Sequence, residues 1–211
     1  MIGPSESRSA ENHGFIVYEK CEEDERGSMD DPVFSAFLRR QLEEGMALAE
    51  QSDLIRLLPW PGSPPDRYTA HFFCWGLVRT ADGAVMEHDR FEVDIWFPPG
   101  YLQGPGDYPR ELTFEVLSWI SPCNVFHPNI SDVAPFICAG HIDPGTSLVQ
   151  LLEQCFDIIT YNKVTMLETD SLNRDACVWA RNNKHRLPLD KRSLKRRHLN
   201  LQLASIDEAG K

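Results

Sequence analysis

Apolar side chains recur at three- and four-residue steps between residues 32 and 57, a spacing that predicts an amphipathic helix. The apolar positions are Phe34, Phe37, Leu38, Leu42, Met46 and Ala49. Asp30 or Asp31 can cap the first turn, and Pro32 suits a helix start because its missing N–H is not needed there. We expect the helix to end before the proline-rich segment 59–65, because no helix continues through consecutive prolines.

Three later segments have the composition or the alternation of β-strands. Residues 68–78 are rich in aromatic residues and contain no proline, while residues 91–97 and 112–117 alternate apolar and polar side chains. The sequence Ala81-Asp82-Gly83 predicts a turn after the first segment. Three strands joined by short turns predict an antiparallel meander, which leaves one face free for a helix.

Helical spacing returns in the last third of the chain. It predicts helices over residues 147–160, over residues 172–180 and from Asp190 to Ile206, with a loop at residues 161–169. A helix, then an antiparallel sheet, then further helices make the predicted fold class α+β.

The chain has 211 residues, enough for one domain with extensions, and 42% hydrophobic residues can form a core. We expect a disordered, acidic N-terminal extension at residues 1–29, one domain at 30–187, and a basic C-terminal helix at 188–211 packed on that domain. The net charge is −11, although residues 181–200 hold eight Lys or Arg against one Asp. This acidic balance argues against nucleic acid as a partner.

The sequence has no apolar run of about 18 residues or more and no secretory signal at its start, so we expect a cytoplasmic protein without membrane contact. The six cysteines form no Cys-x-x-Cys pair and no zinc spacing, so we expect free thiols and no metal. Cys74, Cys155 and Cys177 are expected to pack in the core.

The chemistry-bearing stretch is residues 126–138, with the sequence FHPNISDVAPFIC. Pro128 stiffens the segment, Asn129 carries an amide with two donors, and Cys138 is a nucleophile if its thiol ionises. A cysteine and a fixed amide donor are the minimum parts of an acyl-transfer site, because one carries the acyl group and the other holds the oxyanion. Without these neighbours, Cys138 would be read as a buried structural thiol.

This stretch resembles the active-site segment of ubiquitin-conjugating enzymes, in which His-Pro-Asn is followed by a short turn and the thioester-forming cysteine. Residues 90–101, with the sequence RFEVDIWFPPGY, resemble the family's strand that ends in Phe-Pro-Pro and a tyrosine, and Tyr108-Pro109 resembles the Tyr-Pro after it. Residues 147–160 and 171–182 resemble the two helices that follow the cysteine.

The resemblance covers residues 30–181, a domain of ordinary size, and implies a ubiquitin-conjugating fold. It implies that Cys138 accepts the C-terminal acyl group of a ubiquitin-like protein from an activating enzyme, as a thioester, and passes it to a lysine of a protein substrate. Asn129 would stabilise the oxyanion, and Asp170 would help to position and deprotonate the attacking lysine. No cofactor or metal is implied, because the activating enzyme consumes the ATP.

The chain also departs from the family pattern. The step from His127 to Cys138 is one residue longer than usual, and Arg110-Glu111-Leu112 stands where the family has Lys-Pro-Pro. The Trp-x-Pro turn after the cysteine is missing, and Asp143-Pro144-Gly145 stands near its place. Because those two loops dock ligases in the family, the ligase surface is expected to differ. The chain is most similar to the conjugating enzymes of bacterial ubiquitin-like systems linked to antiviral defence.

Several of these residues have a second interpretation. Asn129 can brace its loop through backbone hydrogen bonds as well as hold an oxyanion, and His127 is expected to fix the turn rather than act as a base. Asp170 competes with Glu168, Ser171 and Asp175 for the functional role, and Asp170 or Ser171 can simply cap the helix that begins near Leu172.

Two other functions stay open. A catalytically inactive relative could hold a ubiquitin-like protein as a binding or scaffold module, although such relatives generally lack the cysteine. A cysteine hydrolase could pair Cys138 with His127 or with His141, but the sequence offers no third group to orient the histidine.

Overall fold

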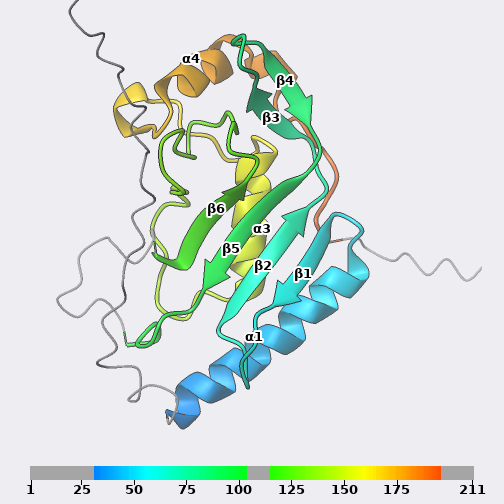
Figure 1. Ribbon diagram of the computed structural model, residues 1–211, viewed down its shortest axis with the longest axis vertical. Helices are drawn as coiled ribbons and strands as arrows, with labels where there is room; N and C mark the ends of the chain where they lie inside the picture. Colours follow the sequence, from blue (N-terminus) through cyan, green and yellow to red (C-terminus); the bar gives the residue numbers. More distant parts are fainter. Residues whose placement is uncertain (1–30, 104–114, 196–211) are drawn as a thin grey trace, which may run out of the picture.

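The computed structural model describes residues 31–103 and 115–195, which form an α+β fold (Figure 1). The first helix, α1, spans Pro32–Gln51, and the carboxylate of Asp31 caps it by accepting the N–H groups of Val33 and Phe34. Of the two predicted caps, Asp30 or Asp31, the structure has Asp31, and the predicted position of Pro32 in the first turn is confirmed. The predictions for residues 1–29 lie outside the described residues.

The helix ends earlier than the apolar spacing predicts. After Ser52 the chain forms strand β1, Ile55–Pro59, in which Ile55 and Leu57 are buried while Arg56 between them is exposed. The apolar spacing of residues 54–57 fits the end of a helix and a half-buried strand equally well. Pairing of this segment with strand β2, Arg67–Phe72, selects the strand. The expectation of helix as far as residue 57 was therefore wrong.

The main sheet has four antiparallel strands in the order β1-β2-β5-β6. Strand β2 spans Arg67–Phe72, β5 spans Phe91–Trp96 and β6 spans Leu117–Ser121, while β3, Gly76–Arg79, and β4, Val85–His88, form a separate hairpin. The helix–sheet–helix order and the antiparallel pairing are confirmed. The sheet has one more strand than expected, and the hairpin is additional.

The segment predicted as one strand over residues 68–78 is broken at residues 73–75. The carboxylate of Asp190 accepts the N–H of Trp75 at 3.1 Å, and the guanidinium of Arg192 donates to the carbonyl of Phe73 at 3.2 Å. Asp190 and Arg192 therefore bind the N–H of Trp75 and the carbonyl of Phe73. In a continuous strand these two groups would be free to pair with a neighbouring strand. A contact over such a sequence separation is not visible in local spacing.

Strand β6, which corresponds to the strand predicted over residues 112–117, lies later in the chain than predicted. The described residues Glu115 and Val116 are not in a strand, which begins only at Leu117, while residues 112–114 lie outside the described part of the chain. Alternation over 112–117 therefore placed a real strand about one strand length too early.

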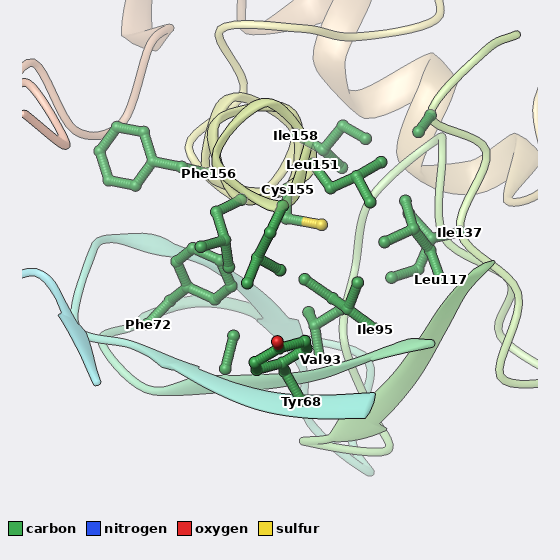
Figure 2. Close-up of a cluster of buried hydrophobic side chains, with 14 of the residues drawn as sticks. Tyr68, Phe72, Val93, Ile95, Leu117, Ile137, Leu151, Cys155, Phe156 and Ile158 are labelled. Carbon is green, nitrogen blue, oxygen red and sulfur yellow. The ribbon is translucent and has the colours of Figure 1, made fainter. Parts of the chain in front are cut away.

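Helix α3, Leu148–Ile159, begins where the apolar spacing predicts, and a complete capping box between Ser147 and Gln150 closes its first turn. Figure 2 shows its apolar side chains facing those of the sheet, among them Leu151, Cys155, Tyr68, Phe72, Val93 and Ile95. The side-chain carbonyl of Gln41 in α1 accepts the N–H of Leu148, which ties the two helices together at 2.7 Å.

Helix α4 spans Arg174–Asn182, and Asn173 caps it by accepting the N–H of Ala176. The cap is therefore neither Asp170 nor Ser171, because the helix begins two residues later than predicted. Short 3₁₀ turns lie at Glu168–Asp170 and Lys184–Arg186.

The helix predicted from Asp190 to Ile206 is absent from its described part, since none of residues 190–195 is helical. Asp190 and Arg192 are instead bound to each other and to the β2–β3 connection. The remainder of the predicted basic helix lies outside the described residues. Within the described ranges, no helix is long and apolar enough to cross a membrane.

Candidate functional site

The loop between residues 130 and 137 folds back on itself and returns Cys138 to Asn129. Ile130 and Ile137 form an antiparallel bridge, and Ser131 donates its N–H to the carbonyl of Phe136 at 3.0 Å. The N–H of Cys138 donates to the carbonyl of Asn129 at 2.7 Å. Two residues that the sequence predicts as site residues, nine positions apart, are thus held side by side.

The amide of Asn129 is bound at both ends. Its Nδ2 donates to the carbonyl of Cys138 at 3.0 Å, and its Oδ1 accepts the N–H of Thr165 at 2.9 Å. The side chain therefore joins the cysteine segment to the loop that follows α3, and the bracing role is confirmed. Nδ2 carries two N–H groups, and the bond to Cys138 occupies one of them, so oxyanion stabilisation stays a prediction.

Cys138 is half-buried, whereas Cys74, Cys155 and Cys177 are buried and Cys123 is exposed. Burial raises the pKa of the Cys155 thiol to about 12, and burial also raises the pKa of Cys74. The thiols of Cys74 and Cys155 are thus kept neutral. All three cysteines are buried, so the core role predicted for them is confirmed. Among the described residues, Cys138 is the cysteine that combines partial access to solvent with a fixed polar neighbour.

His127 is enclosed by the fold. Its Nδ1 accepts the N–H of Asn129 at 3.0 Å, and its ring lies edge-on to that of Tyr161, with the ring centres 4.2 Å apart. Burial lowers the pKa of His127 to about 3. A ring that accepts a backbone N–H and resists protonation fixes the turn, as the sequence predicts, and is not available as a base at neutral pH.

The burial of His127 predicts an acid-sensitive stability. The pKa of His127 is about 3 in the folded protein, against an ordinary value of 6.5 that applies when the chain is unfolded. The contribution of His127 to the free energy of unfolding is therefore complete above pH 6.5 and is lost as the pH falls towards 3. Between pH 7 and pH 5 this group alone should lower the free energy of unfolding by about 2 kcal/mol.

Urea unfolding at both pH values measures this difference in wild type, in His127→Gln and in the control His185→Gln, which changes an exposed histidine. The loss between pH 7 and pH 5 should shrink by that amount in His127→Gln and stay unchanged in His185→Gln. An equal loss in wild type and His127→Gln would contradict the assignment.

His141 has a carboxylate partner that the sequence analysis missed. Its Nε2 lies 3.1 Å from Oδ1 of Asp143, so the expectation that nothing orients this histidine was wrong. Both side chains are exposed, at 73% and 79%, and no hydrogen bond joins the sulfur of Cys138 to a histidine among the described residues. The pair was detectable as two polar residues two positions apart, but the arrangement of a hydrolase triad is not formed.

Asp170 is exposed in the 3₁₀ turn Glu168–Asp170, where its Oδ1 accepts the hydroxyl of Thr169 at 3.0 Å. The same loop after α3 contributes contacts that the sequence analysis did not single out. The backbone of Thr165 binds Asn129, and Lys163 donates from Nζ to the carbonyl of Ala139, directly after Cys138. The signal available in the sequence was a single basic residue in an otherwise uncharged stretch, residues 158–167.

No protein-family model matches this chain, and no curated protein matches it. Among the described residues, no group of three His, Cys, Asp or Glu side chains is placed to hold a metal ion. The functional conclusion therefore rests on the motif and on the geometry around Cys138.

Proposed function

We propose that this chain is a conjugating enzyme of the ubiquitin-conjugating fold. It accepts the C-terminal acyl group of a ubiquitin-like protein on Cys138 as a thioester and transfers it to an amine of a protein substrate. The order of elements is consistent with that fold, since a capped N-terminal helix and a four-stranded antiparallel sheet precede the cysteine and two helices follow it. The resemblance further suggests a bacterial ubiquitin-like system in antiviral defence.

The observation that carries the proposal is the amide of Asn129, which is held between Cys138 and Thr165. A donor that is already oriented stabilises a developing oxyanion without the cost of reorganising during the reaction, and one such donor contributes about 2.7–4 kcal/mol. The half-buried Cys138 lies at the end of the same brace, so nucleophile and donor keep a fixed relation.

The reaction proceeds in two acyl transfers. The Cys138 thiolate attacks the thioester carbonyl held by the activating enzyme, and the bond to that enzyme's sulfur breaks as the new thioester forms. A substrate amine then attacks the Cys138 thioester, the oxyanion is held by Asn129, and collapse expels the Cys138 thiolate. Asp170, exposed in the loop after α3, would position the amine and accept its proton.

Two alternatives are less well supported. A scaffold module would have no use for a half-buried cysteine braced by an amide. A hydrolase would need a histidine on the sulfur, and the ring of His127 is buried against Tyr161 while His141 is turned to Asp143.

Charging with an activating enzyme, ATP and a ubiquitin-like protein, followed by a non-reducing gel, tests the proposal. Wild type should form an adduct that dithiothreitol removes, Cys138→Ala should form none, and Cys138→Ser should form a more stable ester or none. Cys123→Ser is the matched control, because Cys123 is exposed and should not be needed. A dithiothreitol-sensitive adduct that survives in Cys138→Ala would show the assignment to be wrong.

A further inference from the structure

The turn after α3 directs Lys163 towards the segment that carries Cys138. The hydroxyl of Thr160 donates to the carbonyl of Phe156 at 2.7 Å, and Tyr161 adopts a left-handed φ of 62°, which reverses the chain. The N–H of Lys163 then donates to the carbonyl of Asp157 at 2.9 Å. The backbone of Lys163 is therefore fixed against the last turn of the helix.

The head of the Lys163 side chain binds beside the nucleophile. Nζ donates to the carbonyl of Ala139, which is the residue directly after Cys138. A Cβ added to Gly140, which has a φ of 89°, would lie 3.7 Å from Nζ. That distance is an ordinary van der Waals contact, so the lysine head is not crowded on this side. The four-carbon stem allows the amine to move by a few ångströms.

Lys163 also has an acidic neighbour. Burial raises the pKa of the half-buried Asp157, repulsion from Glu153 raises it further, and the charge of Lys163 acts in the opposite direction. The positive charge of Lys163 and the Asp157 carboxylate therefore attract each other across the turn after α3.

The other described lysines are placed differently. Lys195 binds Glu153 at 2.7 Å, Lys184 lies in the 3₁₀ turn after α4, and Lys191 lies in the C-terminal segment beyond it. Among the described residues, Lys163 is the lysine whose amine contacts the residue next to Cys138.

We propose that Lys163 is an acyl acceptor within the same chain, so that a Cys138 thioester with no substrate amine transfers its acyl group to Lys163. This inference rests on the proposed function, because it needs the thioester. Nζ first gives a proton to water. The neutral amine then attacks the thioester carbonyl and a C–N bond forms. The nitrogen gives up a second proton to water and the C–S bond breaks, leaving an isopeptide on Lys163 and a thiolate on Cys138.

The consequence is a self-modification site that competes with substrate. An amine held at the residue next to the thioester-bearing cysteine reacts as if it were present at a very high concentration, so the transfer needs no second molecule. The acylated lysine loses its charge and two of its three N–H donors, which would weaken its hold on the carbonyl of Ala139 and loosen the loop after the nucleophile.

The test uses a small probe, so that it does not depend on knowing the modifier. The full chain with Cys123→Ser is loaded at neutral pH with a Leu-Gly-Gly peptide thioester of 2-mercaptoethanesulfonate, and excess probe is removed. Samples taken over time are treated with dithiothreitol and mapped by tandem mass spectrometry. The same background carries Lys163→Arg, which can still donate to Ala139 but cannot be acylated, the control Lys184→Arg, and Cys138→Ala.

The thioester should convert to a dithiothreitol-resistant amide on Lys163, at a rate that is independent of protein concentration. In Lys163→Arg the amide should fall to below about a tenth of the wild-type yield, Lys184→Arg should match wild type, and Cys138→Ala should give none. An amide at another lysine, an unchanged yield in Lys163→Arg, or a stable thioester without any amide would overturn this inference alone. Failure of Cys138 to take up the acyl group would overturn the proposed nucleophile as well.

Discussion

Asn129→Ala is expected to accept the ubiquitin-like protein on Cys138 but to discharge it to lysine about a hundredfold more slowly, the effect of one lost oxyanion donor. Charging should survive because the backbone bond from the Cys138 N–H to the Asn129 carbonyl does not depend on the side chain. The attack by an amine needs more help, since the amine is poorly activated at neutral pH. Single-turnover discharge of preloaded enzyme into free lysine measures the rate.

The bracing role requires a separate control, because Asn129 also accepts the N–H of Thr165. Thr165→Pro removes that N–H while leaving the amide of Asn129 in place. Its discharge rate should fall much less than that of Asn129→Ala, and Asn129→Asp should be at least as slow as Asn129→Ala, because a carboxylate repels the developing charge. Equal discharge by wild type and Asn129→Ala would leave Asn129 as a brace only.

Tyr161→Ala is expected to lower the free energy of unfolding by about 3–5 kcal/mol, as for other buried aromatic residues. The ring is 2% exposed, lies edge-on to His127, and packs on the Trp179 ring with the centres 6.2 Å apart. Its hydroxyl donates to the carbonyl of Phe126, so the residue supports the entry to the His-Pro-Asn segment. Urea unfolding at pH 7 measures the loss, and charging of Cys138 should decline with it.

Tyr161→Phe is the matched control, because it keeps the ring and removes only the bond to Phe126. It should cost about 1–3 kcal/mol, the penalty of leaving a buried carbonyl without its partner. A cost for Tyr161→Ala no greater than that for Tyr161→Phe would show that the ring packing contributes little to holding this segment.

Local patterns predicted the elements whose boundaries are decided locally. Helix α1 begins at the Asp31-Pro32 pair and α3 at the Ser147 capping box, because side chains within three residues satisfy the first free N–H groups. The end of α1 and the break at residues 73–75 could not be predicted in this way. The first depends on pairing with β2 and the second on Asp190 and Arg192, which lie more than a hundred residues later.

In the candidate site, too, the local part was predicted and the contacts from distant residues were not. The sequence predicts that Cys138 and Asn129 act together, and the bridge between Ile130 and Ile137 brings them together. The loop after α3 was predicted only as a loop, so its contributions from Lys163 and Thr165 were missed. Such contacts depend on where a turn with a left-handed residue points, and tyrosine at that position gives no local signal of it.

The most direct test of the account is to identify the atom that carries the modifier. Wild-type protein is charged by an activating enzyme with ATP, digested without reductant and analysed by tandem mass spectrometry. The account predicts the C-terminal residue of the ubiquitin-like protein on the sulfur of Cys138, as an adduct that dithiothreitol removes. A modifier found on Cys123 with Cys138 unmodified, or no thioester on any cysteine, would contradict it.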